Sequence, residues 1–346
     1  MKSPRSPHSG RLDPALVLLT AALFLPGSGL LPGHAGEPAA STRLEDFLKR
    51  LGFEAIEFKW DDRHAVVQGE LGGKKRSFLL DTGWAITTLD ERAARELKTL
   101  GELNVNLDDS LAGRLSDPDI VLMEELTLGR AKFLNQPARR MKLKTGSSRW
   151  LHDGVLGFDF FYRHHCLLDC TDRRLHVRSA KPSEKVAETL AGSLRLSGMV
   201  EVPMKGKYGT TVEVEINGQS VKLAVDTGAF ATVLDDSQVA RLGLTKLKYS
   251  DPQTGSHLPE NLQTLMVGAG KIGSETLFVS EPKSFRIASQ QWKNVQVGVV
   301  NLVKWGLAKP GTRDEEMQGL LGAELLVHHG ALIDFTSNRL WLRPVR

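Results

Sequence analysis

The sequence predicts a mainly β protein with short helices, built as two pseudo-symmetric lobes. Two internal repeats lead to this fold class. Residues 81–90 align with 226–235 at six identical positions of ten, and residues 154–178 align with 319–343 at ten positions of 25. Since both matches occur in the same order along the chain, they indicate a duplicated domain. Short alternating apolar runs around the repeats are typical of β-strands.

Length and composition fit this architecture. The chain has 346 residues, of which 41% are hydrophobic and 25% charged, as in ordinary globular proteins. The length allows two lobes of about 150 residues, enough for a sizeable core. The net charge is only +4, and no dense run of Lys and Arg alternates with aromatic residues. Nucleic acid is therefore not expected as a partner.

The first 35 residues have the pattern of a signal peptide. Lys2, Arg5 and Arg11 precede an apolar run of 11 residues, and small residues stand before a cleavage position after Ala35. The run is shorter than the roughly 20 residues that a membrane helix needs. We therefore expect an exported protein, periplasmic or secreted, without a stable membrane span after cleavage. A slowly cleaved N-terminus that stays in the membrane is the alternative.

The rest of the chain divides around the repeats. Thr42 and Glu45 form a capping-box pattern that predicts a short helix through Leu51, which could be a docked strap, a pro-segment or an interface element. A polar connector with a short helix around 184–190 joins the lobes. The expected segments are the signal peptide 1–35, the N-terminal helical segment 36–60, the N-terminal lobe 61–180, the linker 181–197 and the C-terminal lobe 198–346.

Within each lobe the same elements are expected in the same order. A hairpin comes first, with its turn at Gly72-Gly73 in one lobe and at Asn217-Gly218 in the other. A strand and a short helix follow, each helix opened by an Asp suited to N-capping. The predicted ranges are strands 66–71, 77–80, 212–216 and 221–225, helices 90–100 and 235–242, β segments 125–133 and 284–300, and closing hairpins 167–178 and 332–343.

No metal or disulfide is expected. Cys166 and Cys170 lie in a predicted strand, where four residues span about 13 Å, beyond the roughly 6.8 Å that a disulfide tolerates. They are expected to be free thiols that face one side. The adjacent pairs His164-His165 and His328-His329 would point to opposite faces of a strand, which does not suit a shared ion.

The chemistry lies in two Asp-Thr-Gly triplets, which begin at Asp81 and Asp226. Each follows an apolar strand that places the carboxylate at the edge of the lobe's interior, and the Gly permits a tight turn. If the repeats face each other, the two carboxylates lie about 3 Å apart and share one proton. Such a pair can activate a water molecule for attack on an amide carbonyl. A simple turn at the end of each strand is the plain alternative.

With a second apolar-apolar-Gly element in each repeat, Val155-Leu156-Gly157 and Leu320-Leu321-Gly322, the sequence resembles the aspartic peptidases, both retropepsin-like and pepsin-like. The resemblance covers residues 62–180 and 198–346. It implies two acid-protease lobes with the active site between them, an aspartic-type endopeptidase that hydrolyses peptide or protein substrates, and no cofactor. It further implies a catalytic pair, Asp81 and Asp226, and supporting residues Thr82, Gly83, Thr227 and Gly228.

Departures from the family pattern leave alternatives open. Trp84 stands where many members have Ser, Thr or Ala, which raises the alternatives of a displaced first loop and of an inactive module that binds peptides in the interlobe cleft. Pairing of each lobe with a like lobe of another chain is a further alternative. Because neither Trp84 nor Ala229 carries a hydroxyl, the acid pair is expected to work at pH 5 to 7.

Three other patterns bear on the substrate site. Residues 108–121 and 265–279 are candidate flaps over the substrate, and the GxGxxG match at 268–273 fits a flexible hairpin better than a nucleotide site. Asp169 and Asp334 occupy equivalent positions between strands, where a carboxylate commonly caps a turn. They are therefore not expected to form the catalytic pair.

Overall fold

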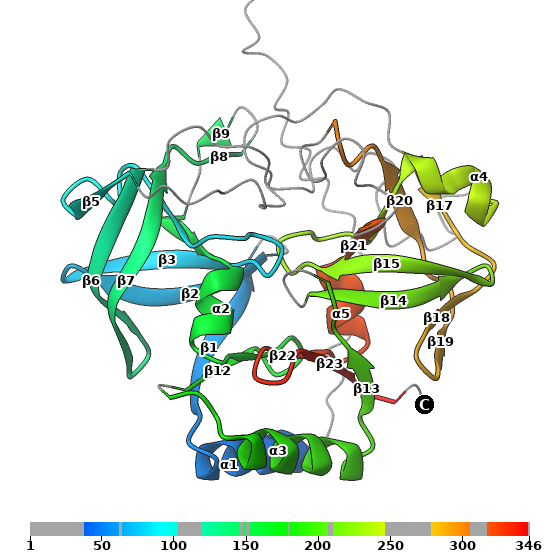
Figure 1. Cartoon of the computed structure of the whole chain (residues 1–346), viewed down its shortest axis with the longest axis horizontal. Coiled ribbons are helices and arrows are strands. Elements are labelled where there is room, and N and C mark those ends of the chain that lie inside the picture. Colours follow the sequence, from blue (N-terminus) through cyan, green and yellow to red (C-terminus); the bar gives the residue numbers. More distant parts are fainter. Residues whose placement is uncertain are drawn as a thin grey trace, which may run out of the picture.

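The computed structural model describes residues 38–61, 64–102, 119–145, 148–149, 152–178, 180–206, 210–245, 278–304 and 317–344. Within them the chain forms two lobes rich in β-strands, joined by a shared sheet (Figure 1). This confirms the predicted fold class. The expected signal peptide lies outside the described residues, and none of the described helices is long and apolar enough to cross a membrane.

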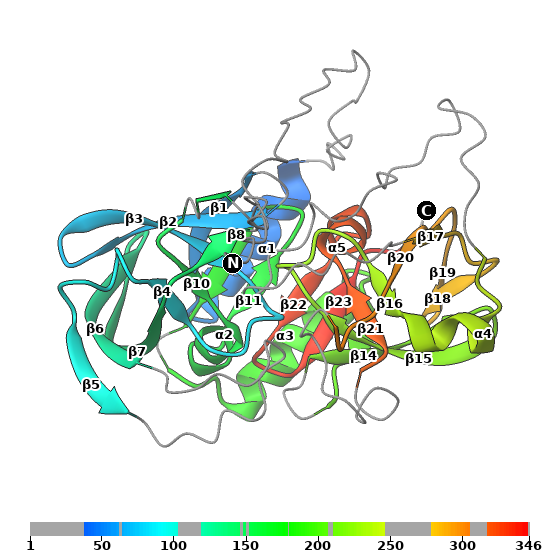
Figure 2. The same ribbon diagram turned by 90° about the horizontal axis from the view of Figure 1, so that it is seen from above.

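The shared sheet contains closing strands from both lobes. Its central pair is antiparallel, with Leu168 opposite Ile333. These residues are equivalent in the sequence repeat, so the pseudo-twofold axis passes between them. Seen from above, β22 and β23 lie between the lobes (Figure 2). In spatial order the strands are β13 (Val200–Pro203), β23 (Arg339–Leu342), β22 (Leu332–Asp334), β11 (Leu167–Asp169), β12 (Arg174–Val177) and β1 (Glu54–Asp61).

Two helices cover the shared sheet on the side away from the lobes, α1 (Pro38–Arg50) and α3 (Glu184–Leu196) (Figure 1). Leu48 of α1 and Leu190 of α3 pack with Trp341 of β23 in one buried cluster. The segment 36–60, expected to be helical, thus contributes both a helix and strand β1 to the shared base. The capping box was wrong, because α1 begins at Pro38 and Thr42 lies inside it.

The N-terminal lobe continues the shared sheet through β1, β2 and β3. The predicted hairpin is confirmed, with Gly72 and Gly73 both at positive φ in its turn. The elements of this lobe are β2 (His64–Leu71), β3 (Lys74–Leu80), β4 (Thr88–Asp90), β5 (Lys98–Glu102), β6 (Asp119–Leu128), β7 (Ala131–Met141), β8 (Lys144–Thr145), β9 (Ser148–Arg149), β10 (Gly154–Leu156) and α2 (Phe158–Arg163).

The C-terminal lobe repeats this plan in a sheet of its own. Its first hairpin is also confirmed, with Asn217 and Gly218 in the turn at φ values of 51° and 77°. The elements are β14 (Thr211–Ile216), β15 (Gln219–Val225), β16 (Val233–Asp235), the 3-10 helix η1 (Asp236–Gln238), α4 (Val239–Leu242), β17 (Phe278–Ser280), β18 (Phe285–Ile287), β19 (Gln290–Trp292), β20 (Val297–Val300), β21 (Gly319–Leu321) and α5 (Ala323–His328).

Two predicted elements of the N-terminal lobe differ from the structure. The helix expected over 90–100 does not form: the Asp90 carboxylate accepts hydrogen bonds from the N–H groups of Arg92 and Leu143, and the chain turns into edge strand β5. The single β segment expected over 125–133 is the turn region of a long hairpin, because Gly129 at φ 59° separates β6 from β7. In the C-terminal lobe, Asp235 caps a helical turn as expected.

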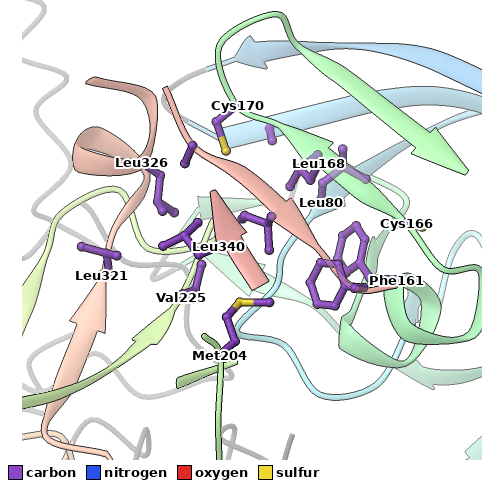
Figure 3. Close-up of a cluster of buried hydrophobic side chains, with 14 of the residues drawn as sticks. Leu80, Phe161, Cys166, Leu168, Cys170, Met204, Val225, Leu321, Leu326 and Leu340 are labelled. Carbon is purple, nitrogen blue, oxygen red and sulfur yellow. The ribbon is translucent and has the colours of Figure 1, made fainter. Parts of the chain in front are cut away.

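One hydrophobic core extends beneath both lobes. Leu80 and Val225, the residues before the two Asp-Thr-Gly triplets, belong to it together with Leu168 and Leu340 of the shared sheet (Figure 3). Cys166 and Cys170 are buried in the same core as free cysteines, which confirms the prediction for both thiols. The continuous core fixes the two lobes against each other at the point where the triplets meet.

Candidate active site

The strand order of each lobe holds its Asp-Thr-Gly loop in place. In the N-terminal lobe β10 lies between β3 and β4, parallel to the first and antiparallel to the second. The loop that joins β3 to β4 therefore passes around the end of β10, and the N–H of Asp81 donates to the carbonyl of Leu156 at 3.1 Å. In the other lobe β21 lies in the same way between β15 and β16, and Asp226 donates to Leu321 at 3.0 Å.

The two loops are locked together by their threonines. The N–H of Thr82 donates to the hydroxyl oxygen of Thr227 at 3.1 Å, and the N–H of Thr227 donates to that of Thr82 at the same distance. Each hydroxyl in turn donates to a carbonyl of the opposite lobe at 2.7 Å, that of Val225 or of Leu80. Both side chains are buried, so these four bonds are shielded from water.

The glycines of the triplets lie against the opposite carboxyl groups. A Cβ atom at Gly83 would come within 2.4 Å of the carboxyl carbon of Asp226, and one at Gly228 within 2.2 Å of that of Asp81. No side chain fits at either position without displacing a carboxyl group. The structure therefore brings Asp81 and Asp226 together across the pseudo-twofold axis, as the sequence predicts.

The carboxyl groups of Asp81 and Asp226 are both buried, and burial changes their pKa values. Burial raises the pKa of Asp81 well above its usual value, and the charge of Asp226 and the hydrogen bond between the two carboxyl groups raise it further. Burial also raises the pKa of Asp226, but the N–H groups of Ala229 and Gly228, at 3.0 and 2.9 Å, lower it. The N–H of Gly83, at 2.9 Å, likewise lowers the pKa of Asp81. Because the Asp226 carboxylate accepts two such bonds, it is the more readily ionised partner of a pair that shares one proton.

Trp84 does not displace the first loop. Its ring is buried in a small cluster with Val66, Leu79, Leu143 and Val155, which we call the Trp84 cluster. The indole N–H donates to the hydroxyl of Thr88 at 2.9 Å, and Thr88 donates to a carbonyl of the same loop. Because the ring packs within its own lobe, the loop keeps the same threonine bonds as its counterpart. The alternative of a displaced loop was wrong.

Two acidic residues behind the loops were missed by the sequence analysis. Asp159 accepts from the N–H and the hydroxyl of Thr87 at 2.6 and 2.7 Å, and that hydroxyl accepts from the N–H of Gly157 at 3.2 Å. In the other lobe, Glu324 takes the place of Asp159. The useful signal was the spacing: each acid follows the Gly of the apolar-apolar-Gly element by two residues.

In the C-terminal lobe, Glu324 makes the contact that Asp159 makes in the N-terminal lobe, with a longer side chain and in a different electrostatic environment. Glu324 accepts from the N–H of Thr232 at 2.6 Å, and the Thr232 hydroxyl accepts from the N–H of Gly322 at 3.0 Å. The second carboxylate oxygen of Glu324 is buried with no hydrogen-bond partner among the described residues. Burial raises the pKa of Glu324 to about 7. Burial raises that of Asp159 as well, partly opposed by the hydrogen bonds from Thr87 and by Arg163.

The other residues that the sequence analysis singled out either cap turns or lie outside the described residues. Asp169 and Asp334 cap turns as expected, each accepting two backbone N–H groups of the residues that follow it. The flap candidates 108–121 and 265–279 lie outside the described residues apart from 119–121 and 278–279, and the GxGxxG match at 268–273 lies wholly outside them.

Comparison with known proteins agrees with this geometry. A family model described as Aspartyl protease matches residues 67–160 and 212–325, which include both Asp-Thr-Gly triplets and both apolar-apolar-Gly elements. The chain belongs to the aspartyl protease family. The two matched segments correspond to the two lobes, so the family model also supports the duplication.

Two further comparisons add little to this assignment. Among solved structures, this aspartyl protease family member is similar to an aspartic proteinase from Irpex lacteus, over 85% of this chain and 98% of the other, at 13% identity and a TM-score of 0.48. The family assignment does not rest on that likeness. A search with the sequence finds no match among curated proteins.

Proposed function

We propose that this protein is an exported aspartic endopeptidase, which hydrolyses peptide bonds of peptide or protein substrates with a water molecule activated by Asp81 and Asp226. One observation carries the proposal. Each loop places its glycine against the carboxyl group of the other lobe, and the two threonines bond reciprocally beneath the pair. This arrangement presents two carboxyl groups to one water molecule.

The different environments of the two acids assign their roles. Asp226 is the more readily ionised and accepts a proton from the attacking water. Asp81 holds the shared proton and donates it to the carbonyl oxygen as the tetrahedral intermediate forms. When the intermediate collapses, the C–N bond breaks and the leaving nitrogen takes up the proton that Asp226 received. At the same time Asp81 takes back a proton from a hydroxyl of the intermediate, which becomes the carboxyl group of the product. The pair then returns to its singly protonated state.

The surrounding residues support these steps. Thr82 and Thr227 fix the distance between the carboxyl groups, because their bonds join the backbone of one lobe to that of the other. Gly83 and Gly228 let the two carboxyl groups come together, because a Cβ atom at either position would overlap the opposite carboxyl group. We further propose that the two glycines allow a peptide backbone to approach the acids. Export is proposed from the signal-peptide pattern of residues 1–35.

The test compares cleavage of a peptide mixture by the wild-type protein with that by Asp81→Asn and Asp226→Asn. Each variant keeps the shape of the side chain but removes a carboxyl group, and we expect cleavage to fall below about 1% of wild type while thermal stability is unchanged or higher. Asp46→Asn, an exposed position on α1, is the matched control. Residual cleavage above that level in both active-site variants would place the chemistry elsewhere.

The same experiment decides between the peptidase and the inactive peptide-binding module, and a separate one tests export. A wild-type protein that binds peptides but cleaves none would be the inactive peptide-binding module. Export is tested in the source cells by fractionation and by N-terminal sequencing of the mature protein. We expect a new N-terminus after Ala35; a mature chain that still begins at Met1 in the cytoplasm would contradict export.

A further inference from the structure

The N-terminal lobe buries the guanidinium group of Arg139. The Arg139 side chain on β7 is only 3% exposed, and its guanidinium donates to the thioether sulfur of Met141. Among the residues that the structure describes, no acid forms an ion pair with it. Burial lowers its pKa to about 10, which still leaves the group charged at neutral pH. A buried, unpaired charge is costly and is usually retained for a purpose.

Arg139 lies on the face of the sheet that carries the Trp84 cluster. Its neighbour Ala138 packs in the main core, and successive residues of a strand point to opposite faces. On β3, Leu80 likewise faces the main core, whereas Leu79 belongs to the Trp84 cluster. Asp81 lies directly beyond the end of β3, two residues after Leu79.

Contacts connect the guanidinium to the catalytic loop. Arg139 stands beside Thr88 in the parallel pairing of β7 with β4, and Thr88 accepts the indole N–H of Trp84. Met141, which contacts the guanidinium, packs against the Trp84 cluster. Trp84 directly follows the Asp81-Thr82-Gly83 triplet in the chain. Through Thr88 and Met141, the buried cation is thus linked to the residue that follows the catalytic triplet.

At the equivalent position of the other lobe the residue is a glycine, Gly298. The N–H of Arg139 donates to the carbonyl of Thr87 at 2.9 Å, and the N–H of Gly298 donates to that of Thr232 at the same distance. Gly298 is also the partner of Val233, just as Arg139 is the partner of Thr88. Arg139 thus corresponds to Gly298, so at this position the two lobes differ by one positive charge.

We propose that Arg139 forms the base of a substrate subsite that selects an acidic side chain, Asp or Glu, on one side of the scissile bond. This inference rests on the proposed peptidase function and names its substrate class. A substrate carboxylate neutralises the buried charge and can accept two parallel N–H bonds from a guanidinium. A neutral substrate leaves the cation unpaired. Since the equivalent position is Gly298, no matching preference arises on the other side.

The first test uses pairs of peptides that differ only by Glu or Gln, placed in turn at the three positions on each side of the scissile bond. The C-termini are amidated, so that only the side chain supplies a carboxylate. At one position, and on one side only, we expect the wild-type kcat/KM to be about tenfold or more higher for Glu, as a charge-assisted pair provides. The preference should decline as the pH falls through the Glu pKa of about 4.3.

Variants then assign the preference to this residue. In Arg139→Gln the Glu to Gln ratio should collapse to about one to two, and Arg139→Lys should restore part of it, since Lys keeps the charge but not the planar donors. Lys132→Gln is the control, because Lys132 is an exposed cation on the same strand. The proposal is overturned if no position shows the preference, or if Arg139→Gln keeps it.

A binding measurement separates this inference from the peptidase proposal. Full-length Asp226→Asn should bind the Glu peptide about tenfold more tightly than the Gln peptide, and the difference should vanish when Arg139→Gln is added. Equal cleavage of both peptides by wild type leaves the peptidase function standing and overturns the subsite. If no peptide is cleaved but the Glu peptide still binds more tightly, the peptidase proposal is overturned and the subsite stands.

A stability measurement tests whether Arg139 has a structural role instead. Arg139→Met should be at least as stable as wild type; a large loss of stability would indicate a structural role and overturn the proposal.

Discussion

Thr82 and Thr227 each donate a backbone N–H to the other's hydroxyl oxygen at 3.1 Å, although the two residues are 145 positions apart in the chain. Equal distances in the two directions mean that the loops are related by the same pseudo-twofold axis as Leu168 and Ile333 in the shared sheet. The relative position of the two acids therefore depends on bonds that cross between the lobes.

Removing one hydroxyl should therefore affect stability and activity together. Thr227→Val keeps the shape of the side chain but leaves the N–H of Thr82 and the carbonyl of Leu80 buried without partners. We expect a loss of about 2–5 kcal/mol in the free energy of unfolding, measured in urea, and a fall in kcat. Thr227→Ser keeps the hydroxyl and should retain most of both. Equal behaviour of the Val and Ser variants would show that these bonds are unimportant.

Glu324 should make the protein less stable as the pH rises. Burial raises its pKa from 4.5 in the unfolded chain to about 7, so between these values the folded state holds more protons than the unfolded state. The stabilising contribution is present below pH 4.5 and is lost as the pH rises through 7, by roughly 3 kcal/mol. In Glu324→Gln, stability relative to wild type should increase over that range. Urea unfolding from pH 4 to 8 measures it, with exposed Glu213→Gln as the control; a pH-independent difference would contradict the prediction.

The acid pair should work under mildly acidic to neutral conditions. Neither Trp84 nor Ala229 offers a hydroxyl to the carboxylates, and burial raises the pKa of both acids. We expect appreciable kcat/KM at pH 5 to 7. In Ala229→Ser the added donor should stabilise the ionised form of the acid pair. The acidic limb of the profile of kcat/KM against pH should then move to lower pH by about one unit. A maximum below pH 4, with an acidic limb that Ala229→Ser leaves unmoved, would show that the missing hydroxyl is irrelevant.

Trp84 should act as a packing residue rather than as a block to catalysis. Trp84→Phe keeps most of the ring in the Trp84 cluster but loses the bond to Thr88, so about 1 kcal/mol of stability should be lost while kcat stays within about threefold. Trp84→Ala should cost about 3–5 kcal/mol, because it leaves a cavity. A large gain in kcat for Trp84→Phe would instead mean that the indole obstructs the site.

Features set by local sequence or by the repeat could be predicted. Asn217-Gly218 determines a tight turn by its own backbone preferences. The repeat, together with the family resemblance, predicts that Asp81 and Asp226 face each other, as they do. Features that depend on distant partners could not. Asp90 is a good helix cap by type, but its carboxylate binds the N–H of Leu143, which lies more than 50 residues away.

The same reason explains what was missed at the candidate site. The direction of the Trp84 ring depends on packing against Leu143 and Val155, which the triplet itself does not encode. Asp159 and Glu324 perform related roles with side chains of different length, so identity between the repeats did not mark them. Arg139 stands out only when its burial and lack of an acidic partner are known.

The separation of the Asp81 and Asp226 carboxyl groups in a crystal structure, determined at a pH where the enzyme is active, tests the central claim most directly. The proposed mechanism predicts that one ordered water lies within hydrogen-bond distance of both carboxyl groups, on the pseudo-twofold axis between the lobes. A separation beyond about 6 Å, too wide for a single bridging water, would contradict a mechanism in which the two lobes of one chain share the reaction.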